Sequence, residues 1–348
     1  MTASSPLNVI RAQRRPACGL CGARGEELYS DLHDRLYGAP GTWNCRACPR
    51  ADCGLLWLDP MPLEDDLAKA YRAYFTHHRG PRSASLLKRL VRFLGEGYLA
   101  GRYGYQRAET GPAKKWAGLI VYASPLRRPR LDFQLMYLPV QSGARLLEIG
   151  CGNGDMLQIL QEAGWQAEGV DFDPAAVTIA RDKGLQVHLG TVESKGYATN
   201  TFDAITSSHT IEHLSDPALF LNECYRILKT RGRLAIVTPN SRSLGHQFFK
   251  QSWLHLDPPR HLHIFNVPSL HRLVTETGFR NIHIWTTIRD ADRLFAASQA
   301  IRRTGQYAWG SRQPIPVRIV GKTFQVVEYV LVALGCQLGE EIAVTAEK

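Results

Sequence analysis

The chain has 348 residues and a formal net charge of +10, and its 44% of hydrophobic residues is ordinary for a folded, soluble protein. The first sixteen residues lack the continuous apolar run of a secretory signal, and no stretch of 18 residues is free of charged or polar interruptions. We therefore expect a cytoplasmic protein without a membrane-spanning helix, long enough for one large domain with attachments.

Residues 1–16 are polar and basic without a periodic pattern, which predicts a disordered tail. Five of the eight cysteines follow between Cys18 and Cys53. In a cytoplasmic protein, two groups of cysteines about 25 residues apart are more typical of a tetrahedral metal site than of disulfides. We therefore predict a zinc-binding module over residues 17–62.

Glycine follows both Cys21 and Cys53, as the tight turn after a zinc ligand requires. The predicted ligands of a structural zinc are therefore Cys18, Cys21, Cys48 and Cys53. Cys45 is then a spare, although Cys45 and Cys48 also have ligand spacing. A set of reduced, buried thiols is the alternative.

The segment from Leu55 to Pro62 reads as an apolar strand that ends in a proline turn, and a helix is predicted from Leu63 to Phe75. The cysteines followed by this strand, by Asp-Pro-Met-Pro and by a tyrosine-containing helix resemble the N-terminal zinc module of some bacterial methyltransferases, including certain sugar C-methyltransferases. The resemblance covers residues 18–78.

The basic character of the chain belongs to one segment, because residues 71–130 contain 13 Lys and Arg but only two Glu. Apolar residues at 86, 87, 90, 91 and 94 fall on one face of a helix, and we interpret residues 63–135 as a basic helical region. Such helices contact an anionic membrane surface, bind phosphate or nucleic acid, or pack on a neighbouring domain. The sequence leaves these alternatives open, with peripheral contact of residues 86–130 at the inner membrane surface as one expectation.

From residue 136 strands and helices alternate regularly, which predicts a parallel sheet covered on both faces. Strands are predicted at 145–149, 167–170, 186–189, 202–206 and 233–238, and helices at 154–163, from 174, and at 217–228. The first strand leads into Glu148-Ile-Gly-Cys-Gly-Asn-Gly154, where the glycines let the backbone approach a ligand. Asp171 ends the second strand, where a carboxylate can bind both hydroxyls of a ribose. Glu148 would repel a pyrophosphate and suits a cationic ligand.

These two segments resemble the first motifs of class I S-adenosylmethionine (SAM) methyltransferases. Later segments keep the order of small-molecule enzymes that include ubiquinone-biosynthesis O-methyltransferases: His209-Thr-Ile-Glu-His213, Asp216-Pro217, Arg226-Ile-Leu-Lys229, Gly232-Arg-Leu234 and Thr238-Pro-Asn240. The resemblance implies an α/β fold with a Rossmann-like seven-stranded methyltransferase sheet over residues 136–348, beside a zinc-ribbon-like module and the helical basic linker.

The resemblance also implies a set of cofactor contacts. Glu148 would face the cationic end of SAM, Asp171 the ribose, Phe172 the adenine and His209 the methyl group. The full implied set is Glu148, Gly150, Cys151, Gly152, Asp171, Phe172 and His209. Asp155 is either a further contact or a helix cap.

Residues 241–267 are rich in His and aromatic residues and are predicted to form a substrate lid, because ligands of open α/β sheets bind beyond the carboxyl ends of the strands. Residues 289–335 read as a helical insertion, in which Gln325 and Glu328 favour a buried helix or a homodimer contact over a membrane span. Residues 339–346 are predicted as the final strand, antiparallel at the sheet edge as in the methyltransferase family.

Histidines are the candidate general bases, because the pKa of an unperturbed imidazole is close to neutral. The predicted catalytic residues are His209, His261 and His263, and His213 has a catalytic or a structural role. A divalent metal held by His209, Glu212 and His213, which the likeness to ubiquinone-type enzymes suggests, and a merely packed histidine loop are the alternatives.

The sequence therefore predicts a SAM-dependent methyltransferase acting on a small or lipid-linked metabolite, such as a sugar or polysaccharide precursor, with SAM and structural zinc. An RNA methyltransferase is the alternative enzyme, since a zinc module with a basic segment is also a nucleic-acid feature. Nucleic acid is not the expected partner, because Ser207-Ser-His-Thr210 lacks the Pro-Pro motif of enzymes that methylate exocyclic base amines. A SAM-binding zinc scaffold without catalysis is the non-enzymatic alternative, and the acceptor atom is undefined.

Overall fold

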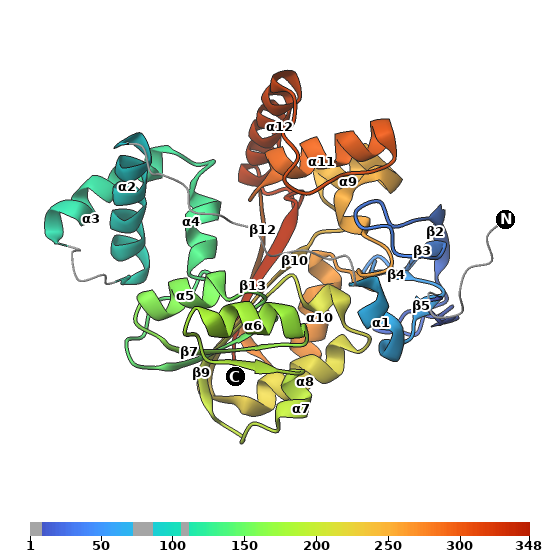
Figure 1. Cartoon of the computed structure of the whole chain (residues 1–348), viewed down its shortest axis with the longest axis horizontal. Helices are drawn as coiled ribbons and strands as arrows, with labels where there is room; N and C mark the ends of the chain where they lie inside the picture. Colours follow the sequence, from blue (N-terminus) through green and yellow to red (C-terminus); the bar gives the residue numbers. More distant parts are fainter. Residues whose placement is uncertain (1–8, 72–85, 106–110) are drawn as a thin grey trace.

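A seven-stranded sheet lies at the centre of the computed structural model, which describes residues 9–71, 86–105 and 111–348 (Figure 1). In pairing order its strands are β12 (Arg280–Thr287), β13 (Glu341–Glu347), β10 (Leu228–Pro239), β9 (Phe202–Ser208), β6 (Arg145–Ile149), β7 (Gln166–Asp171) and β8 (Val187–Leu189). The strands from β10 to β8 pair in parallel, so their carboxyl ends meet at one edge. The five strands expected from the sequence are confirmed.

Alternate residues of the central strands face two different hydrophobic cores, because successive side chains of a strand point to opposite faces. Leu147 and Ile205 belong to the core of one face, and their neighbours Leu146 and Ala204 to the core of the other. The covering helices are α5 (Asp155–Glu162), α6 (Pro174–Asp182), α7 (Val192–Lys195), α8 (Pro217–Ile227) and α10 (Val267–Glu276). The helices predicted at 154–163, from 174 and at 217–228 are thereby confirmed.

The last strand is not at the edge where we expected it. β13 lies between β10 and β12 and is antiparallel to both, so β12 forms the edge. All but two residues of β13 are buried, whereas most of β12 is exposed or half-buried. The more apolar strand therefore takes the inner position, where both of its neighbours shield it.

The N-terminal module contains a four-stranded sheet, and one of its strands comes from residues 263–264, about 200 residues later in the chain. Its strands, in pairing order, are β11 (His263–Ile264), β4 (Leu56–Leu58), β3 (Trp43–Ala47) and β2 (Glu26–Leu32). A two-stranded sheet, β1 (Ala12–Gln13) with β5 (Met61–Pro62), and the helix α1 (Glu64–Ala70) complete it. Its apolar residues share one core with the central sheet.

The predicted disordered tail is wrong for residues 9–16, and residues 1–8 lie outside the described part. Ile10 is buried, and the Arg15 amide donates to the Asp59 carboxylate at 2.7 Å. The Asp59 carboxylate also accepts a hydrogen bond from the Arg46 side chain. This buried acid and the arginines near it therefore hold the polar segment in place. Disorder was predicted because the segment has no hydrophobic periodicity. Long-range polar contacts hold it in place without such a periodicity.

The predicted lid over 241–267 is a packed part of the shared core. It contains α9 (Leu244–Phe249) and the 3-10 turns η4 (Lys250–Ser252) and η5 (Leu254–Leu256) before it enters β11. Arg260 in this loop is fully buried. Because β11 is hydrogen-bonded to β4, the loop joins the N-terminal module to the carboxyl edge of the central sheet.

The basic segment is helical where it is described. It forms α2 (Leu86–Tyr103), α3 (Pro112–Gly118), the 3-10 turn η2 (Leu119–Ala123) and α4 (Arg128–Gln134). A methyl group on Gly97 would lie 2.0 Å from the Lys114 carbonyl oxygen, so this glycine allows α2 and α3 to pack closely. The segment stands beside the main sheet at the upper left of Figure 1.

The predicted helical insertion forms α11 (Ala291–Thr304) and α12 (Ile315–Ala333). Gln325 and Glu328 of α12 are buried, but most of this helix is exposed and it is not the buried helix that was one of the two expectations. Within residues 9–71, 86–105 and 111–348, no helix combines the length and apolar content needed to cross a bilayer.

Candidate active site

The glycine loop after β6 leaves open space above the sheet. Gly150, Gly152 and Gly154 all have positive φ, at 73°, 52° and 79°, which favours glycine at each. A methyl group on Gly150 would lie 2.1 Å from Thr210 Oγ1, so this position is closed by packing. A methyl group on Gly152 would meet no atom of the described residues within 4 Å. Gly152 is therefore where a ligand can approach the backbone.

Asp171 at the end of β7 holds the loop in shape. Its carboxylate accepts hydrogen bonds from the Gly152 amide at 2.7 Å and from the Asp173 amide at 2.9 Å. The next residue, Phe172, is half exposed and packs edge-on against Tyr71, with ring centroids 5.2 Å apart. The predicted ribose and adenine residues thus lie beside the predicted backbone approach.

Glu148 lies beneath this loop as a buried acid. Burial, together with the nearby charges of Asp171 and Asp155, raises its pKa well above the ordinary range. Its Oε2 atom has no hydrogen-bond partner within the described residues. A buried carboxyl group with an unsatisfied oxygen is costly unless a ligand completes it. The group fits a cationic ligand held at Gly152.

Cys151 of the predicted cofactor set, and Asp155, which was left open as a contact or a helix cap, have other contacts. The Cys151 side chain is buried against the sheet, where a methyl group on Gly169 would lie 2.6 Å from its sulfur. Only the backbone of Cys151 therefore belongs to the loop surface. Asp155 pairs with Lys183 at 2.7 Å and makes no helix-capping contact with its side chain.

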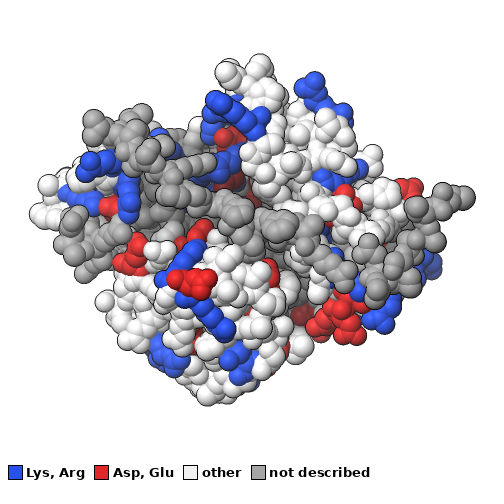
Figure 2. Space-filling model, in the orientation of Figure 1, with Lys and Arg blue, Asp and Glu red and all other residues white. Residues whose placement is uncertain are grey.

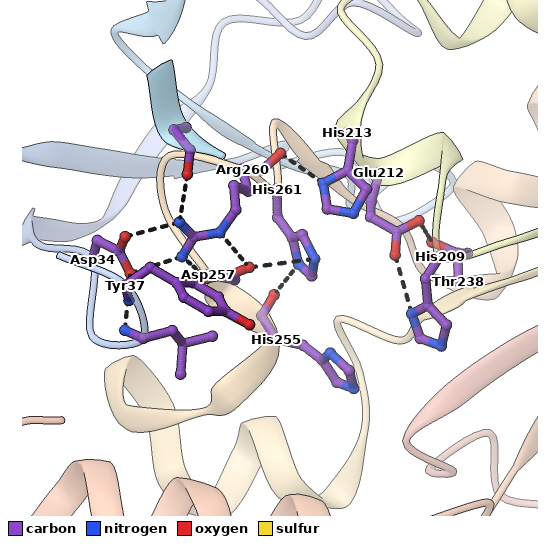
Figure 3. Close-up of polar contacts among 12 residues, drawn as sticks. Asp34, Tyr37, His209, Glu212, His213, Thr238, His255, Asp257, Arg260 and His261 are labelled. Atoms are coloured by element: carbon purple, nitrogen blue, oxygen red, sulfur yellow. Dashed lines mark hydrogen bonds and ion pairs between the residues drawn. The ribbon is translucent and has the colours of Figure 1, made fainter. Parts of the chain in front are cut away.

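A histidine cluster lies at the ends of β9 and β10 (Figure 3). We define it as His209, Glu212, His213, His255 and His261. His209, Glu212 and His213 follow β9, and Glu212 and His213 lie in the turn η3 (Ile211–His213). His255 comes from η5, and His261 comes from the loop before β11. The rings of His209 and His255 stack 5.7 Å apart, and those of His213 and His261 meet edge-on at 4.7 Å.

His209 is held between two buried acids. Its Nδ1 lies 3.2 Å from Glu212 Oε1, and its Nε2 lies 2.8 Å from Glu341 Oε1. Burial alone would lower its pKa, but the hydrogen bonds to Glu212 and Glu341 outweigh burial and raise that pKa to about 9. Both ring nitrogens are engaged and the ring carries a proton at neutral pH. The structure thus argues against the predicted general-base role of His209, and it is Thr210 that contacts the end of β6, at Ile149.

Nδ1 of both His213 and His261 contacts a carbonyl group, and Nε2 of His261 lies 4.0 Å from Asp257 Oδ2. Nδ1 of His213 lies 3.0 Å from the Arg260 carbonyl oxygen, and Nδ1 of His261 lies 2.7 Å from the His255 carbonyl oxygen. Donation to a carbonyl fixes the tautomer and leaves Nε2 as an acceptor. Burial and the neighbouring His261 lower the pKa of His213 to about 4. Single atoms of Glu212, His213 and His261 lie within 4.8 Å of one another, so these residues can share a proton or a cation.

His263 points elsewhere, although it is only two residues from His261. Its Nδ1 contacts the Leu214 carbonyl oxygen at 3.1 Å, and its ring packs near Phe265. It lies on β11, which pairs with β4 of the N-terminal module. The structure places His263 in that sheet and apart from the cluster, contrary to its predicted catalytic role.

The four predicted zinc ligands meet in the N-terminal module. Sulfur atoms of Cys18 and Cys53 are 3.7 Å apart and those of Cys21 and Cys48 are 3.4 Å apart, with all four within 4.8 Å of one another. Zinc–sulfur bonds of about 2.3 Å in a tetrahedron give sulfur separations of about 3.8 Å. The sulfurs fit that geometry. Cys45 is buried in β3 outside this group, as the spacing of glycines indicated.

Four residues near the cluster were absent from the predicted site. His255 contributes a ring whose Nε2 is buried without a partner in the described chain. Glu341 from β13 and Arg289 from the turn after β12 contact His209, and the Tyr71 hydroxyl lies 3.1 Å from His213 Nδ1. His255 stood in the histidine-rich loop and could have been included. The other three carry no local signal, because only the fold brings them near.

Comparison with known proteins agrees with this geometry. Residues 114–284 match the family described as "Methyltransferase domain". The ubiquinone biosynthesis O-methyltransferase of Xanthomonas oryzae pv. oryzae is 34% identical over 118 residues, which are 32% of this chain and 49% of the relative. That of Alkalilimnicola ehrlichii is 30% identical over 126 residues, 34% of this chain and 51% of the relative. The chain spans about half the length of the curated relatives it matches.

Among solved structures, a SAM dependent methyltransferase from Archaeoglobus fulgidus is 22% identical, with a TM-score of 0.43 over 66% of this chain and 94% of that chain. The family match covers the glycine loop, Asp171 and the histidine cluster. The seven-stranded sheet with an antiparallel β13 is the Rossmann-like methyltransferase sheet predicted from the sequence, with β13 inside the sheet and not at its edge. Residues 114–284 therefore belong to the family described as a methyltransferase domain.

Proposed function

We propose that this protein transfers a methyl group from SAM to a small or lipid-linked metabolite, such as a sugar or polysaccharide precursor. The observation that carries the proposal is the buried, unsatisfied Glu148 beside the open backbone of Gly152. The names of the relatives, which concern ubiquinone biosynthesis, support a small acceptor with a lipid character. The zinc module, which resembles that of sugar C-methyltransferases, supports a sugar.

Bound SAM would supply an electrophilic methyl group on a sulfonium. The residues present divide the remaining work between them. Glu148 balances the positive charge of the cofactor, and Asp171 orders the loop beside which the ribose would bind. His261 accepts the proton of the acceptor at Nε2, since its Nδ1 is held by the His255 carbonyl. His209, charged between Glu212 and Glu341, fixes Glu212 beside His213 and His261.

Replacement of Asp171 by alanine is expected to weaken SAM binding about a hundredfold, because hydrogen bonds to a charged group contribute roughly 1.5–3 kcal/mol. Isothermal titration with SAM and its demethylated product measures this. Asp182→Ala, an exposed acid at the end of α6, is the matched control and should bind as the wild type does. No binding by folded wild type would overturn the proposal and favour a scaffold.

The same titrations test Glu148. Burial raises the pKa of Glu148, and a bound cationic ligand lowers that pKa. SAM binding should therefore release protons and tighten as the pH rises toward the raised pKa. Titration in two buffers of different ionisation enthalpy measures the released protons. The release should be absent in Glu148→Gln, and an equal release in that variant would assign the protons to another group.

Replacement of His261 by glutamine is expected to lower kcat at least a hundredfold with SAM affinity unchanged, because loss of a general base costs about 10² to 10⁴ in rate. His263→Gln, two residues away and outside the cluster, should retain kcat. The assay is formation of demethylated SAM with nucleotide sugars, lipid-linked glycans and quinone precursors as acceptors.

The cluster has a second interpretation, because Glu212, His213 and His261 also offer ligand atoms for a divalent cation. Hydrogen bonds from metal-ligating histidines to carbonyl groups are common, so the contacts at both Nδ1 atoms fit either role. Activity lost in chelator and restored by Mg²⁺ would replace the general-base assignment by a metal assignment. Activity unaffected by chelator supports His261 as the base.

We also propose a structural zinc at Cys18, Cys21, Cys48 and Cys53. The glycines that follow the second and fourth ligands, Gly22 and Gly54, have φ of 71° and 60°, which supports two tight ligand turns. The module is too small to build a core of its own and shares one with the main sheet. Zinc would then fix the face that carries β4 against β11.

A further inference from the structure

Helix α12 has its polar and apolar faces in the reverse of the usual arrangement. Its inward face carries Gly321, Gln325 and Glu328, all buried, with the Gln325 side chain donating to the Ile288 carbonyl oxygen at 3.0 Å. Its outward face carries seven large aliphatic residues whose exposed fractions run from 44% to 76%: Ile315, Ile319, Val320, Val326, Val327, Val330 and Leu334. A helix packed on a domain normally buries such residues.

The apolar residues form one continuous stripe. At 3.6 residues per turn, the seven side chains fall within an arc of about 140° on the helix surface. Arg318 and Lys322, both exposed, lie beside one border of that arc. An exposed apolar stripe of this length marks an interaction surface, because single exposed apolar residues are ordinary but contiguous ones are not.

The charge around this stripe is positive. Arg312 precedes α12, and Arg302 and Arg303 end the neighbouring helix α11, all of them exposed. The two acids of these helices are already engaged or enclosed, since Asp292 pairs with Lys322 at 2.8 Å and Glu328 is buried. In Figure 2 Lys and Arg flank the white surface of α12 at the top of the view.

The turn from α3 into η2 also carries exposed apolar residues, with exposed cations on the same group of helices. Trp116, Leu119, Ile120 and Tyr122 are exposed there, and Trp116 has 72% of its surface in solvent. The exposed cations Arg89, Lys115 and Arg127 lie on the same group of helices, whose acid Glu96 pairs with Arg92 and Lys114. Both helical units stand clear of the central sheet in the upper half of Figure 1.

We propose that the outward stripe of α12, with the apolar turn of α3 and η2, docks on an anionic lipid surface. Lipid tails would cover the aliphatic side chains while the bordering cations meet lipid phosphates, as in amphipathic helices that lie in a bilayer interface. A second copy of the chain fits less well, because a two-fold contact would place positive patches against each other. Surface docking needs no spanning helix and does not rest on the proposed methyl transfer.

Co-sedimentation of the full chain with extruded vesicles tests this surface. At low salt we expect binding to phosphatidylcholine vesicles containing phosphatidylglycerol, and little binding to phosphatidylcholine alone. Ile319→Asp with Val330→Asp should weaken binding more than tenfold. Arg312→Gln with Arg318→Gln should weaken it about 25-fold, from the attraction of each cation to an anionic surface.

The matched control is Leu28→Asp with Leu219→Asp, two exposed leucines on β2 and α8, and it should bind as the wild type does. SAM affinity and the thermal unfolding temperature of every variant show that the fold is kept. Equal binding by the α12 and control variants would overturn the proposal, as would failure of the wild type to bind anionic vesicles. A dimer in sedimentation velocity that Ile319→Asp dissociates would instead assign the stripe to self-association.

Discussion

Replacement of Arg260 by methionine is expected to lower the free energy of unfolding by about 3–5 kcal/mol, because it leaves two buried carboxylates without their counter-charge. Arg260 is fully buried and reaches Asp34 with both terminal nitrogens, at 2.8 and 2.7 Å, and Asp257 through Nε at 3.0 Å (Figure 3). It also donates to the Ala70 carbonyl oxygen and stacks over Tyr37. One guanidinium therefore joins the N-terminal module to the loop that carries His261.

Urea unfolding measures this effect, with Arg272→Met as the matched control. Arg272 forms an exposed pair with Glu276 one helical turn away, and such pairs contribute at most about 1 kcal/mol. Adding Asp257→Asn to Arg260→Met should recover part of the stability, because it removes one stranded charge. A loss as small as that of Arg272→Met would show that the network is not coupled to folding.

The same network predicts that the free energy of unfolding falls at low pH. Burial raises the pKa of Asp34, but the Arg260 hydrogen bonds and charge outweigh it and leave that pKa below the ordinary value. A carboxyl group with a lowered folded-state pKa stabilises the fold above its unfolded pKa of about 3.9. That contribution is lost as the pH falls through the folded pKa. In Arg260→Met this loss of unfolding free energy at low pH should be smaller.

Removal of zinc is expected to unfold the N-terminal module, because the free energy of structural zinc binding is about 10–16 kcal/mol and is largely folding free energy. Cys48→Ser should lower the bound zinc from one per chain to a small fraction, measured by atomic absorption. Since Trp43 and Trp57 of the module are buried, their fluorescence should shift toward that of exposed tryptophan. Chelation of the wild type should give the same spectrum.

Cys45→Ser is the matched control for this experiment. Cys45 is also buried, lies three residues before Cys48, and stands outside the group of four sulfurs. It should keep a full complement of zinc with a modest loss of stability. Full zinc in Cys48→Ser together with loss in Cys45→Ser would show that Cys45 is the ligand in its place.

Much of the site could be predicted from short stretches of sequence. The glycine loop, Glu148 and Asp171 lie within one strand–turn–helix–strand unit, so their spacing alone indicates their relative placement. The four cysteines behave in the same way, because each ligand pair is made by a local turn. His213 and His261 were named as candidate bases from their residue type. The sequence did not show which of the histidines, His209 included, has this role. That choice depends on Glu341, which lies 132 residues beyond His209.

By itself, the sequence determined the alternation of strands and helices, the cofactor turn and the cysteine set, because these depend on contacts within a few turns of chain. Only the tertiary structure decided that β11 joins the N-terminal sheet, that Arg260 links Asp34 to Asp257, and that His209 carries a charge. It also decided which face of α12 is turned outward. These features arise where segments far apart in the chain meet, and such meetings leave no periodic pattern in either segment.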